Sequence, residues 1–246
     1  DKSVDEAKDR VRAAIINTSF DMPGTRLTVN LASADIHKVG SAFDLPIALG
    51  ILAAAGMVKK DSLKNGLFLG ELSLEGEIKR IPGVISITLM ARSKNIARIF
   101  VPIANIDEAT LVDGIEIYPV KSLGEVVLHL NGEIPIAACL KSEIKVLSCQ
   151  DYNFQFENIK GQQTAKRACE IAAAGFHNLI FKGPPGTGKT LLSKAFPSIL
   201  PPLSKEEILE ITRVYSVAGL LKDSFFVSSR PFRSPHHTTS RIGLVG

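Results

Sequence analysis

Gly183-Pro-Pro-Gly-Thr-Gly-Lys-Thr190 decides the fold of the C-terminal part of this chain, because it matches the phosphate-binding loop G-x-x-x-x-G-K-[ST] in every fixed position. Ahead of it, the apolar run at residues 177–182 predicts a short buried strand. Behind it, residues 190–196 open a helical pattern. Strand, loop and helix in this order are the context that the motif requires, so the sequence predicts nucleotide binding. The alternative is a glycine-rich surface turn.

Each residue type in the loop has a part in holding phosphate. The glycines let the backbone approach closely, and the backbone N–H groups cradle phosphates at the positive end of the following helix. Lys189 reaches the β and γ phosphates, and the Thr190 hydroxyl holds Mg²⁺. The predicted cofactors are therefore ATP and Mg²⁺. The predicted binding residues are Gly183, Pro184, Pro185, Gly186, Thr187, Gly188, Lys189 and Thr190.

Composition is typical of a globular α/β protein. Hydrophobic residues make up 45% and charged residues 22%, and no apolar run is long enough to cross a bilayer. The sequence shows no secretory signal and does not begin with Met, so we expect a fragment of a longer chain and leave open whether a leader precedes it. Cys139, Cys149 and Cys169 lack C-x-x-C spacing and favour reduced thiols in a cytoplasmic protein over a metal site or disulfides.

Charge is distributed unevenly. Residues 151–246 hold 12 Lys or Arg and 7 Asp or Glu, which leaves 17 and 18 for residues 1–150. The excess positive charge therefore lies in the part with the phosphate loop. Such a charge suits polyanionic partners without identifying nucleic acid.

The pattern of apolar residues over 1–136 predicts one α/β domain. Residues 137–153 lose this periodicity and are predicted to form a linker. A capping box at Ser3 and Glu6 starts the first helix, and Ser122 with Glu125 caps the last one. The other expected elements are a strand at 27–31, a helix from 44 to 55, a hairpin over 67–81, a helix at 84–93, strands at 98–101 and 115–118, and a short helix over 105–112.

Residues 154–246 read as a second α/β domain that contains the phosphate loop. Ser204 and Glu207 form a further capping box for a helix that ends near residue 216. Three acidic residues in its first turns, Glu206, Glu207 and Glu210, resemble paired catalytic carboxylates. Complementarity to the helix dipole is the simpler explanation.

Four separated stretches carry a resemblance to a known family. They are Lys38-Val-Gly-Ser-Ala-Phe-Asp-Leu-Pro-Ile-Ala-Leu-Gly50, Gly70-Glu-Leu-Ser-Leu-Glu-Gly76, the phosphate loop, and Arg230-Pro-Phe-Arg-Ser-Pro-His-His237. Together they resemble the magnesium-chelatase-like AAA+ ATPases, with the ComM (YifB) branch as the best match. The resemblance implies a Lon-protease-like domain, with the ribosomal protein S5 domain 2 type of α/β fold, followed by a truncated P-loop AAA+ α/β domain.

The resemblance also implies an activity. Members of this branch are expected to be hexameric, ATP-driven DNA motors that promote branch migration during natural transformation. The family's acidic Walker B pair, its sensors and its arginine finger are expected beyond Gly246, so this part of the chain is expected to bind nucleotide without the complete hydrolytic machinery.

The Lon-type protease chemistry is expected to be lost. Laying the Lon pattern on this sequence puts Ala42 at the nucleophilic serine and Ile85 at the basic lysine, and neither side chain can do that work. Ser41 is a displaced alternative nucleophile, with Lys38 and Lys79 as the only obvious bases. The domain is expected to serve in oligomerisation or substrate contact.

Five basic residues follow the second domain's last helix and are the candidate DNA contacts: Arg230, Arg233, His236, His237 and Arg241. Phosphate contact in a central pore and a merely solvated or structural loop remain equal interpretations. A metal site at the two histidines is disfavoured, because adjacent side chains of an extended segment point to opposite faces.

Three functions remain open at this point. The leading one is a DNA-remodelling ATPase of the ComM type. The others are a chelatase-like motor that acts on a protein partner for metal insertion, and a regulatory nucleotide-binding module without motor activity. The expected partners are nucleotide, single-stranded or branched DNA and further copies of the chain, with no membrane.

Overall fold

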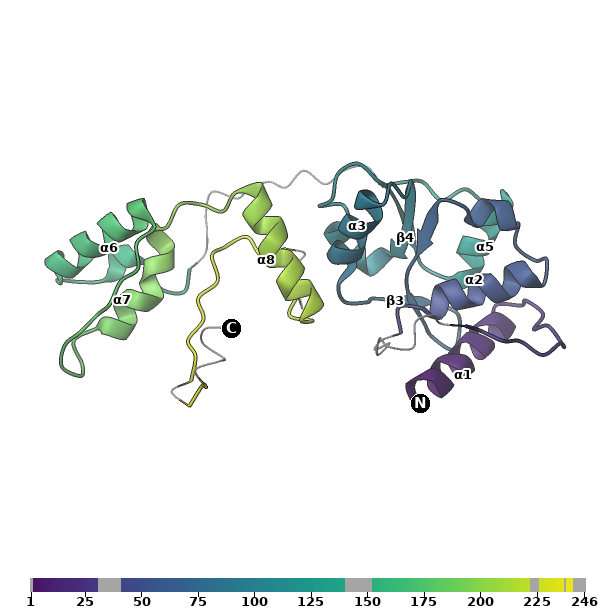
Figure 1. Ribbon diagram of the computed structural model, residues 1–246, viewed down its shortest axis with the longest axis horizontal. Helices are drawn as coiled ribbons and strands as arrows, with labels where there is room; N and C mark the ends of the chain where they lie inside the picture. Colours follow the sequence, from purple (N-terminus) through teal and green to yellow (C-terminus); the bar gives the residue numbers. More distant parts are fainter. Residues whose placement is uncertain (1, 31–40, 140–151, 222–225, 237, 241–246) are drawn as a thin grey trace. The chain divides into compact units, whose positions relative to one another are not determined.

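A computed structural model describes residues 2–30, 41–139, 152–221, 226–236 and 238–240 (Figure 1). The chain divides into two compact units, the first formed within residues 1–144 and 212–225 and the second within 145–211 and 226–246. Each unit has its own core and is described by itself. Within the described residues, no helix has the length and apolar character needed to cross a bilayer.

The first unit is a mixed α/β fold around a parallel sheet of three strands in the order β1, β4, β5, with a second, antiparallel pair formed by β2 and β3. Ile99 and Phe100 of β4 pair with Ile117 and Tyr118 of β5. The strands are β1 (Gly66–Phe68), β2 (Glu71–Leu72), β3 (Ile78–Lys79), β4 (Arg98–Pro102) and β5 (Glu116–Val120).

α-Helices pack around these strands in the described part of the first unit, and Figure 1 shows α3 and α5 on opposite sides of β4. They are α1 (Lys2–Asn17), α2 (Asp44–Ala54), α3 (Val84–Ser93), α4 (Ile106–Ala109) and α5 (Leu123–Asn131); short 3-10 turns are η1 (Lys60–Leu63) and η2 (Ile103–Asn105). The predicted capping box of α5 is confirmed, because Ser122 Oγ accepts a hydrogen bond from the Glu125 N–H at 3.3 Å.

Alternation along β4 divides the core between the two faces of the sheet. Phe100 packs toward α1, α2 and α5, where its ring stacks between Phe68 at 4.6 Å and Tyr118 at 4.8 Å. Its neighbours Ile99 and Val101 pack on the other face with residues of α3 and α4. The side chains of Ile99, Phe100 and Val101 are all fully buried, and burial on both faces of the sheet explains the continuous apolar run in this strand.

Residues 212–221 belong to the first unit. The Ser216 hydroxyl donates a hydrogen bond to the buried Glu108 carboxylate and accepts one from the Gly83 N–H at 2.8 Å. The Arg80 guanidinium donates to the Leu221 carbonyl at 2.9 Å. These contacts join groups 108 to 141 residues apart in the sequence, which periodicity along the chain does not predict.

The second unit is built from helices around a small core. Its helices are η3 (Phe156–Asn158), α6 (Gln163–Gly175), α7 (Lys189–Ala195), η4 (Phe196–Ile199) and the first part of α8 (Lys205–Val217). Buried core residues are Phe156, Ile159, Cys169, Leu192 and Ala195. The predicted cap of α8 is confirmed as a reciprocal pair: Glu207 N–H donates to Ser204 Oγ at 3.2 Å, and Ser204 N–H donates to Glu207 Oε2 at 2.8 Å.

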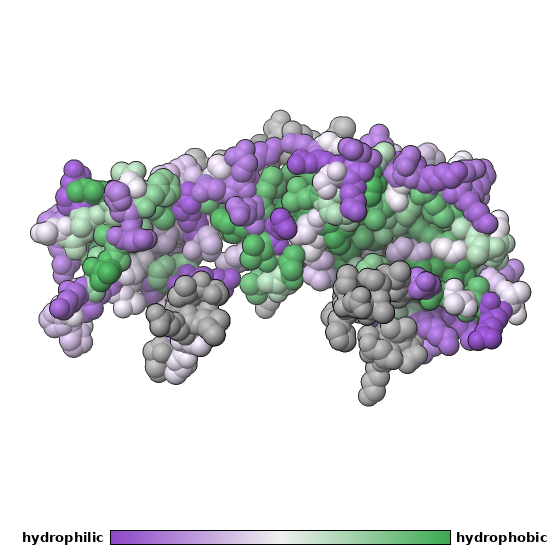
Figure 2. Space-filling model, in the orientation of Figure 1, coloured by the Kyte–Doolittle hydropathy of each residue, from purple (hydrophilic) through white to green (hydrophobic). Residues whose placement is uncertain are grey.

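Two predicted strands are wrong, so far as the structure describes them. Residues 27–30 and 177–182 have no regular secondary structure, and no strand pairs with them among the described residues. A β-strand exists through hydrogen bonds to a neighbour, and an apolar run alone does not supply that neighbour. Ile180 accordingly is 94% exposed, and Figure 2 shows hydrophobic surface over α6 and α7 of this unit.

The predicted hairpin over 67–81 is only partly confirmed. Its inner arms form the antiparallel pair β2 and β3 around the Glu75-Gly76 turn, as the alternation predicts. The residues before them form β1, which pairs in parallel with β4 instead. Gly70, with φ 157°, lies between the two, and an added Cβ there would come within 2.4 Å of Ile78 Cγ2. This close approach requires glycine where the chain leaves one sheet for the other.

Candidate nucleotide site and basic loop

The phosphate-binding loop connects the irregular segment 177–182 to α7, which begins at Lys189. Gly186 and Gly188 adopt left-handed backbone conformations, with φ of 81° and 83°. Residues with a Cβ rarely adopt this conformation, so the two glycines of the motif allow the loop to turn back on itself. Residues 183–187 are exposed to solvent.

Lys189 lies against its own loop. Its ammonium donates to the carbonyl oxygens of Gly183 at 2.9 Å and Pro184 at 2.5 Å, and to Thr187 Oγ1 at 3.4 Å. The only positive side chain of the motif is therefore held where the loop would receive phosphate. Phosphate oxygens, which carry more charge than carbonyls, are the stronger acceptors for this ammonium.

The donor set fits a magnesium nucleotide. An ammonium, a hydroxyl at Thr190 and a glycine-rich run of backbone N–H groups are the groups that recognise phosphates and their Mg²⁺. Thr190 is exposed in the first turn of α7, so its hydroxyl is accessible to a metal ion. Among the described residues, His, Cys, Asp and Glu form no group of three that would hold a metal by itself.

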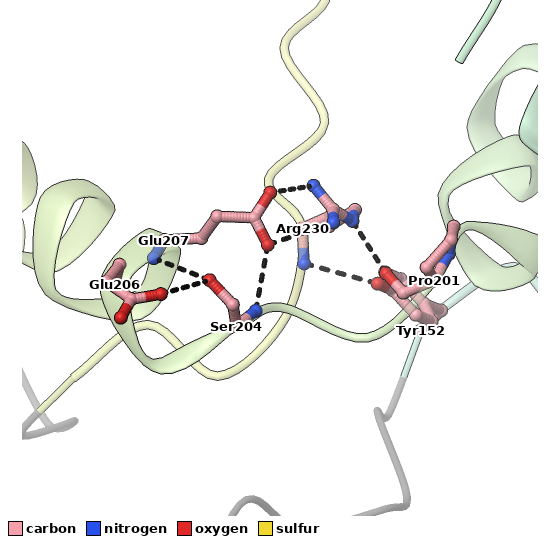
Figure 3. A network of polar contacts seen from close by, with 6 residues as sticks. All are labelled: Tyr152, Pro201, Ser204, Glu206, Glu207 and Arg230. Carbon is pink, nitrogen blue, oxygen red and sulfur yellow. Dashed lines mark hydrogen bonds and ion pairs between the residues drawn. The ribbon is translucent and has the colours of Figure 1, made fainter. Parts of the chain in front are cut away.

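Arg230, a candidate DNA contact, has intramolecular partners instead of an exposed guanidinium (Figure 3). Its two terminal nitrogens donate to the Glu207 carboxylate at 3.1 and 3.2 Å, and Nε donates to the Pro201 carbonyl at 2.8 Å. The backbone N–H donates to the Tyr152 hydroxyl at 3.2 Å, and the guanidinium carbon lies 5.8 Å from the Phe176 ring centroid. The side chain is only 17% exposed, so Arg230 fastens this segment to the second unit.

Glu207 belongs to the cap of α8 and also pairs with the basic loop, which is the segment 230–241 that holds the candidate DNA contacts. The backbone N–H of Ser204 and, after it, the Arg230 guanidinium lower the pKa of this carboxyl below its ordinary value. Because Glu207 accepts from both, its negative charge serves the helix cap and the ion pair together (Figure 3). The acid–base interpretation of this residue has no support in these contacts.

Of the other candidate DNA contacts in this loop, two are exposed and two lie outside the described residues. Arg233 and His236 are exposed, and His236 Nδ1 lies 2.7 Å from the Thr238 hydroxyl. His237 and Arg241 lie outside the described residues, as does Cys149. Cys139 and Cys169 are free thiols, the second buried.

The two positions that align with the Lon serine and lysine, Ala42 and Ile85, lie in the first unit. Ile85 is fully buried near the start of α3, and its N–H donates to Glu108 Oε1 at 3.0 Å. Ala42 is half-buried and packs against the apolar cluster that contains Val84. The Ser41 hydroxyl donates to the Glu71 carboxylate rather than to a lysine. Within the described residues, no nucleophile is paired with a base at these positions.

Comparison with known proteins gives two family matches. A model for the magnesium chelatase subunit ChlI matches residues 155–246, and a second model for subunit ChlI of Mg-chelatase matches residues 1–105. Competence protein ComM of Haemophilus influenzae is 42% identical over 248 residues, which cover all of this chain and 48% of that protein. The YifB proteins of Salmonella typhimurium and Escherichia coli are 39% and 38% identical, with 99% of this chain and 47% of each relative covered.

These matches run through both units and include the phosphate loop and the basic loop. The chain spans about half the length of the relatives that it matches. On this similarity the chain belongs to the magnesium-chelatase ChlI-like proteins of the ComM/YifB family.

Proposed function

We propose that residues 183–190 bind the phosphates of ATP with Mg²⁺, as the nucleotide site of an AAA+ motor. The observation that carries this proposal is a complete phosphate-binding loop whose two left-handed glycines and Lys189 are in place ahead of a helix. In this role backbone N–H groups hold the phosphates, Lys189 neutralises their charge and Thr190 binds the metal ion. When bound, Mg²⁺ would offset charge that develops on the transferring phosphoryl group.

Hydrolysis requires residues beyond the loop. We propose that the acidic Walker B pair, the sensors and an arginine finger are supplied by the rest of the longer protein, which in the relatives is about as long again. We further propose that the protein assembles as a homo-hexamer and that residues 1–136, which lie within the first unit, form a Lon-protease-like module used for assembly or substrate contact. The segment 137–153 is then the linker to the motor domain.

DNA is the proposed target of the motor. This rests on the 42% identity with a protein named for competence and on the net positive charge of the second part. The specific activity that we propose is ATP-driven branch migration or strand separation during natural transformation or recombination. Exposed Arg233 and His236 are the described candidates for phosphate contact, and Arg230 has the structural role of holding their loop.

Replacing Arg233 with glutamine should weaken DNA binding by the whole protein similarly for all sequences. Each phosphate contact that is lost should also reduce the slope of log affinity against log salt by about 1 per subunit that binds. Fluorescence anisotropy with labelled single-stranded DNA at several salt concentrations measures both quantities. Arg167→Gln, an exposed arginine on α6 paired with Glu170, is the matched control. An unchanged affinity and slope for Arg233→Gln would make the loop purely structural.

A second candidate is a chelatase-like motor that remodels a protein partner during metal insertion. The observation in its favour is that both matching family models describe the chelatase subunit. This candidate and a regulatory nucleotide-binding module both predict nucleotide binding without a response to DNA. Stimulation of ATP hydrolysis by DNA therefore separates them from the leading proposal.

The first unit is proposed to have no protease activity. Ala42 has no oxygen to attack a carbonyl and buried Ile85 has no amine to accept a proton. We expect the whole protein to leave unfolded casein intact in the presence of ATP and Mg²⁺, as followed by gel electrophoresis. Casein cleavage that disappears in Ser41→Ala would contradict this and identify Ser41 as a displaced nucleophile.

A further inference from the structure

Gln162 reaches the phosphate-binding loop from a distant part of the second unit. Its side-chain amide nitrogen donates a hydrogen bond to the Thr187 carbonyl at 3.2 Å, across 25 residues of sequence. The backbone turns sharply just before α6 to place it there: Gly161 has φ 70°, and Gln162 itself is left-handed with φ 55° and ψ 38°. A left-handed glutamine is uncommon, and residues held in this way cluster at functional sites.

Gln162 is the residue that precedes α6, but its side chain does not cap that helix. Only its backbone carbonyl serves the helix, by accepting from the Lys166 N–H at 2.8 Å. The segment is fixed by Lys166, whose ammonium donates to the Ile159 carbonyl and lies 5.6 Å from the Phe156 ring centroid. The Gln162 side-chain amide is therefore directed to the phosphate-binding loop rather than to its own helix, from a segment that Lys166 anchors.

The consequence follows from the planarity of the peptide bond. The Thr187 carbonyl and the Gly188 N–H belong to one trans peptide, in which the two groups point in opposite directions. Gly188 has φ 83° and no Cβ, so the Thr187–Gly188 peptide can rotate at little steric cost. A donor that holds the carbonyl on one side thus keeps the N–H of Gly188 directed to the other side, where it can donate to a phosphate oxygen.

We propose that Gln162 is a positioning residue of the nucleotide site: it fixes the Thr187–Gly188 peptide in the orientation in which the Gly188 N–H can hold phosphate. The inference rests on the proposed binding of ATP by residues 183–190. Gln162 itself contacts the loop and not the nucleotide. Its effect should therefore be the same for every ligand whose phosphates enter the loop, whatever base the ligand carries.

Gln162→Gly tests this, because glycine readily adopts the left-handed backbone and removes the side chain that carries the amide. Gln162→Asn is the second variant, since asparagine also tolerates this conformation but is one methylene shorter. In the whole protein, both should raise the Kd for Mg·ATP, for Mg·ADP and for inorganic triphosphate about five- to tenfold, the effect of one lost hydrogen bond. The melting temperature should stay within about 2 °C of the wild-type value, as expected for an exposed residue.

The same variants should change the KM for ATP without changing kcat. A contact that holds phosphate equally in the ground and transition states affects KM and leaves kcat unchanged, so KM for ATP should rise five- to tenfold. Gln163→Ala, the adjacent exposed glutamine at the first position of α6, is the control and should behave as wild type.

The outcomes are distinguishable. Wild-type protein that binds no Mg·ATP would remove the proposed nucleotide site itself. Wild-type protein that binds, with Gln162→Gly and Gln162→Asn binding equally well, would overturn the positioning role alone. An equal loss of affinity in Gln163→Ala would also overturn it, because the effect would then belong to the start of α6 in general.

Discussion

Replacing Lys189 with alanine should lower the affinity for Mg·ATP on the order of 100-fold, the effect of removing charged hydrogen bonds to phosphate. In the structure the ammonium donates to two loop carbonyls and the Thr187 hydroxyl, all of which are weaker acceptors than phosphate. Nucleotide binding exchanges these contacts for stronger ones, and a methyl group makes neither. Titration with a fluorescent ATP analogue measures the difference.

Lys194→Ala is the matched control for this experiment. Lys194 lies on the same helix, α7, but its ammonium lies over the Phe154 ring, 5.3 Å from the ring centroid. Its removal should leave the affinity within about twofold of wild type, as for a surface residue away from the site. Equal affinities of Lys189→Ala and the wild-type protein would remove residues 183–190 as the nucleotide site.

Replacing Arg10 with alanine should destabilise the packing of α1 on α2 by about 3 kcal/mol, the effect of leaving a buried charge without its partner. Arg10 on α1 donates from Nε to Asp44 Oδ2 at 2.9 Å, and the Asp44 side chain is only 1% exposed. This hydrogen bond is the largest cause that raises the pKa of Arg10. Without the guanidinium, the Asp44 carboxylate would keep the hydrogen bond from the Leu72 N–H at 3.3 Å but would lose its positively charged partner.

Hydrogen exchange measured by mass spectrometry follows this effect within the intact protein. Amides of α2 that open with the first unit should exchange on the order of 100-fold faster in Arg10→Ala. Lys64→Ala removes a fully exposed ion pair with Asp61 in the same unit and should change exchange very little. Unchanged protection of α2 in Arg10→Ala would show that the Asp44 carboxylate does not depend on this pair.

Elements with local signals were predictable from the sequence. The helix at 84–93 has the predicted bounds, and the capping boxes of α5 and α8 start those helices, because a cap and an apolar period lie within a few residues of each other. The conformation of the phosphate loop was likewise fixed by glycines inside the motif. These features can be predicted from the sequence because the residues that form each of them lie close together along the chain.

Contacts between distant residues were not predictable in this way. The parallel pairing of β1 with β4 and the place of residues 212–221 in the first unit depend on partners far along the chain. The same is true of Arg230, a basic residue in a basic loop whose ion pair with Glu207 only the fold reveals. The hydrogen bond from Gln162 to the phosphate-binding loop was missed as well, and the consecutive Gly161 and Gln162 ahead of a helix were the sequence signal for a special turn.

The rate of ATP hydrolysis by the whole protein, with and without branched or single-stranded DNA, tests the proposed function most directly. A DNA-remodelling motor couples the two, so DNA should raise the rate, and Lys189→Ala should abolish hydrolysis under both conditions. We expect hydrolysis that depends on Lys189 and is stimulated by DNA, with a stimulation that weakens with salt as phosphate contacts are lost. Hydrolysis that depends on Lys189 but is the same with every DNA and without DNA would contradict it.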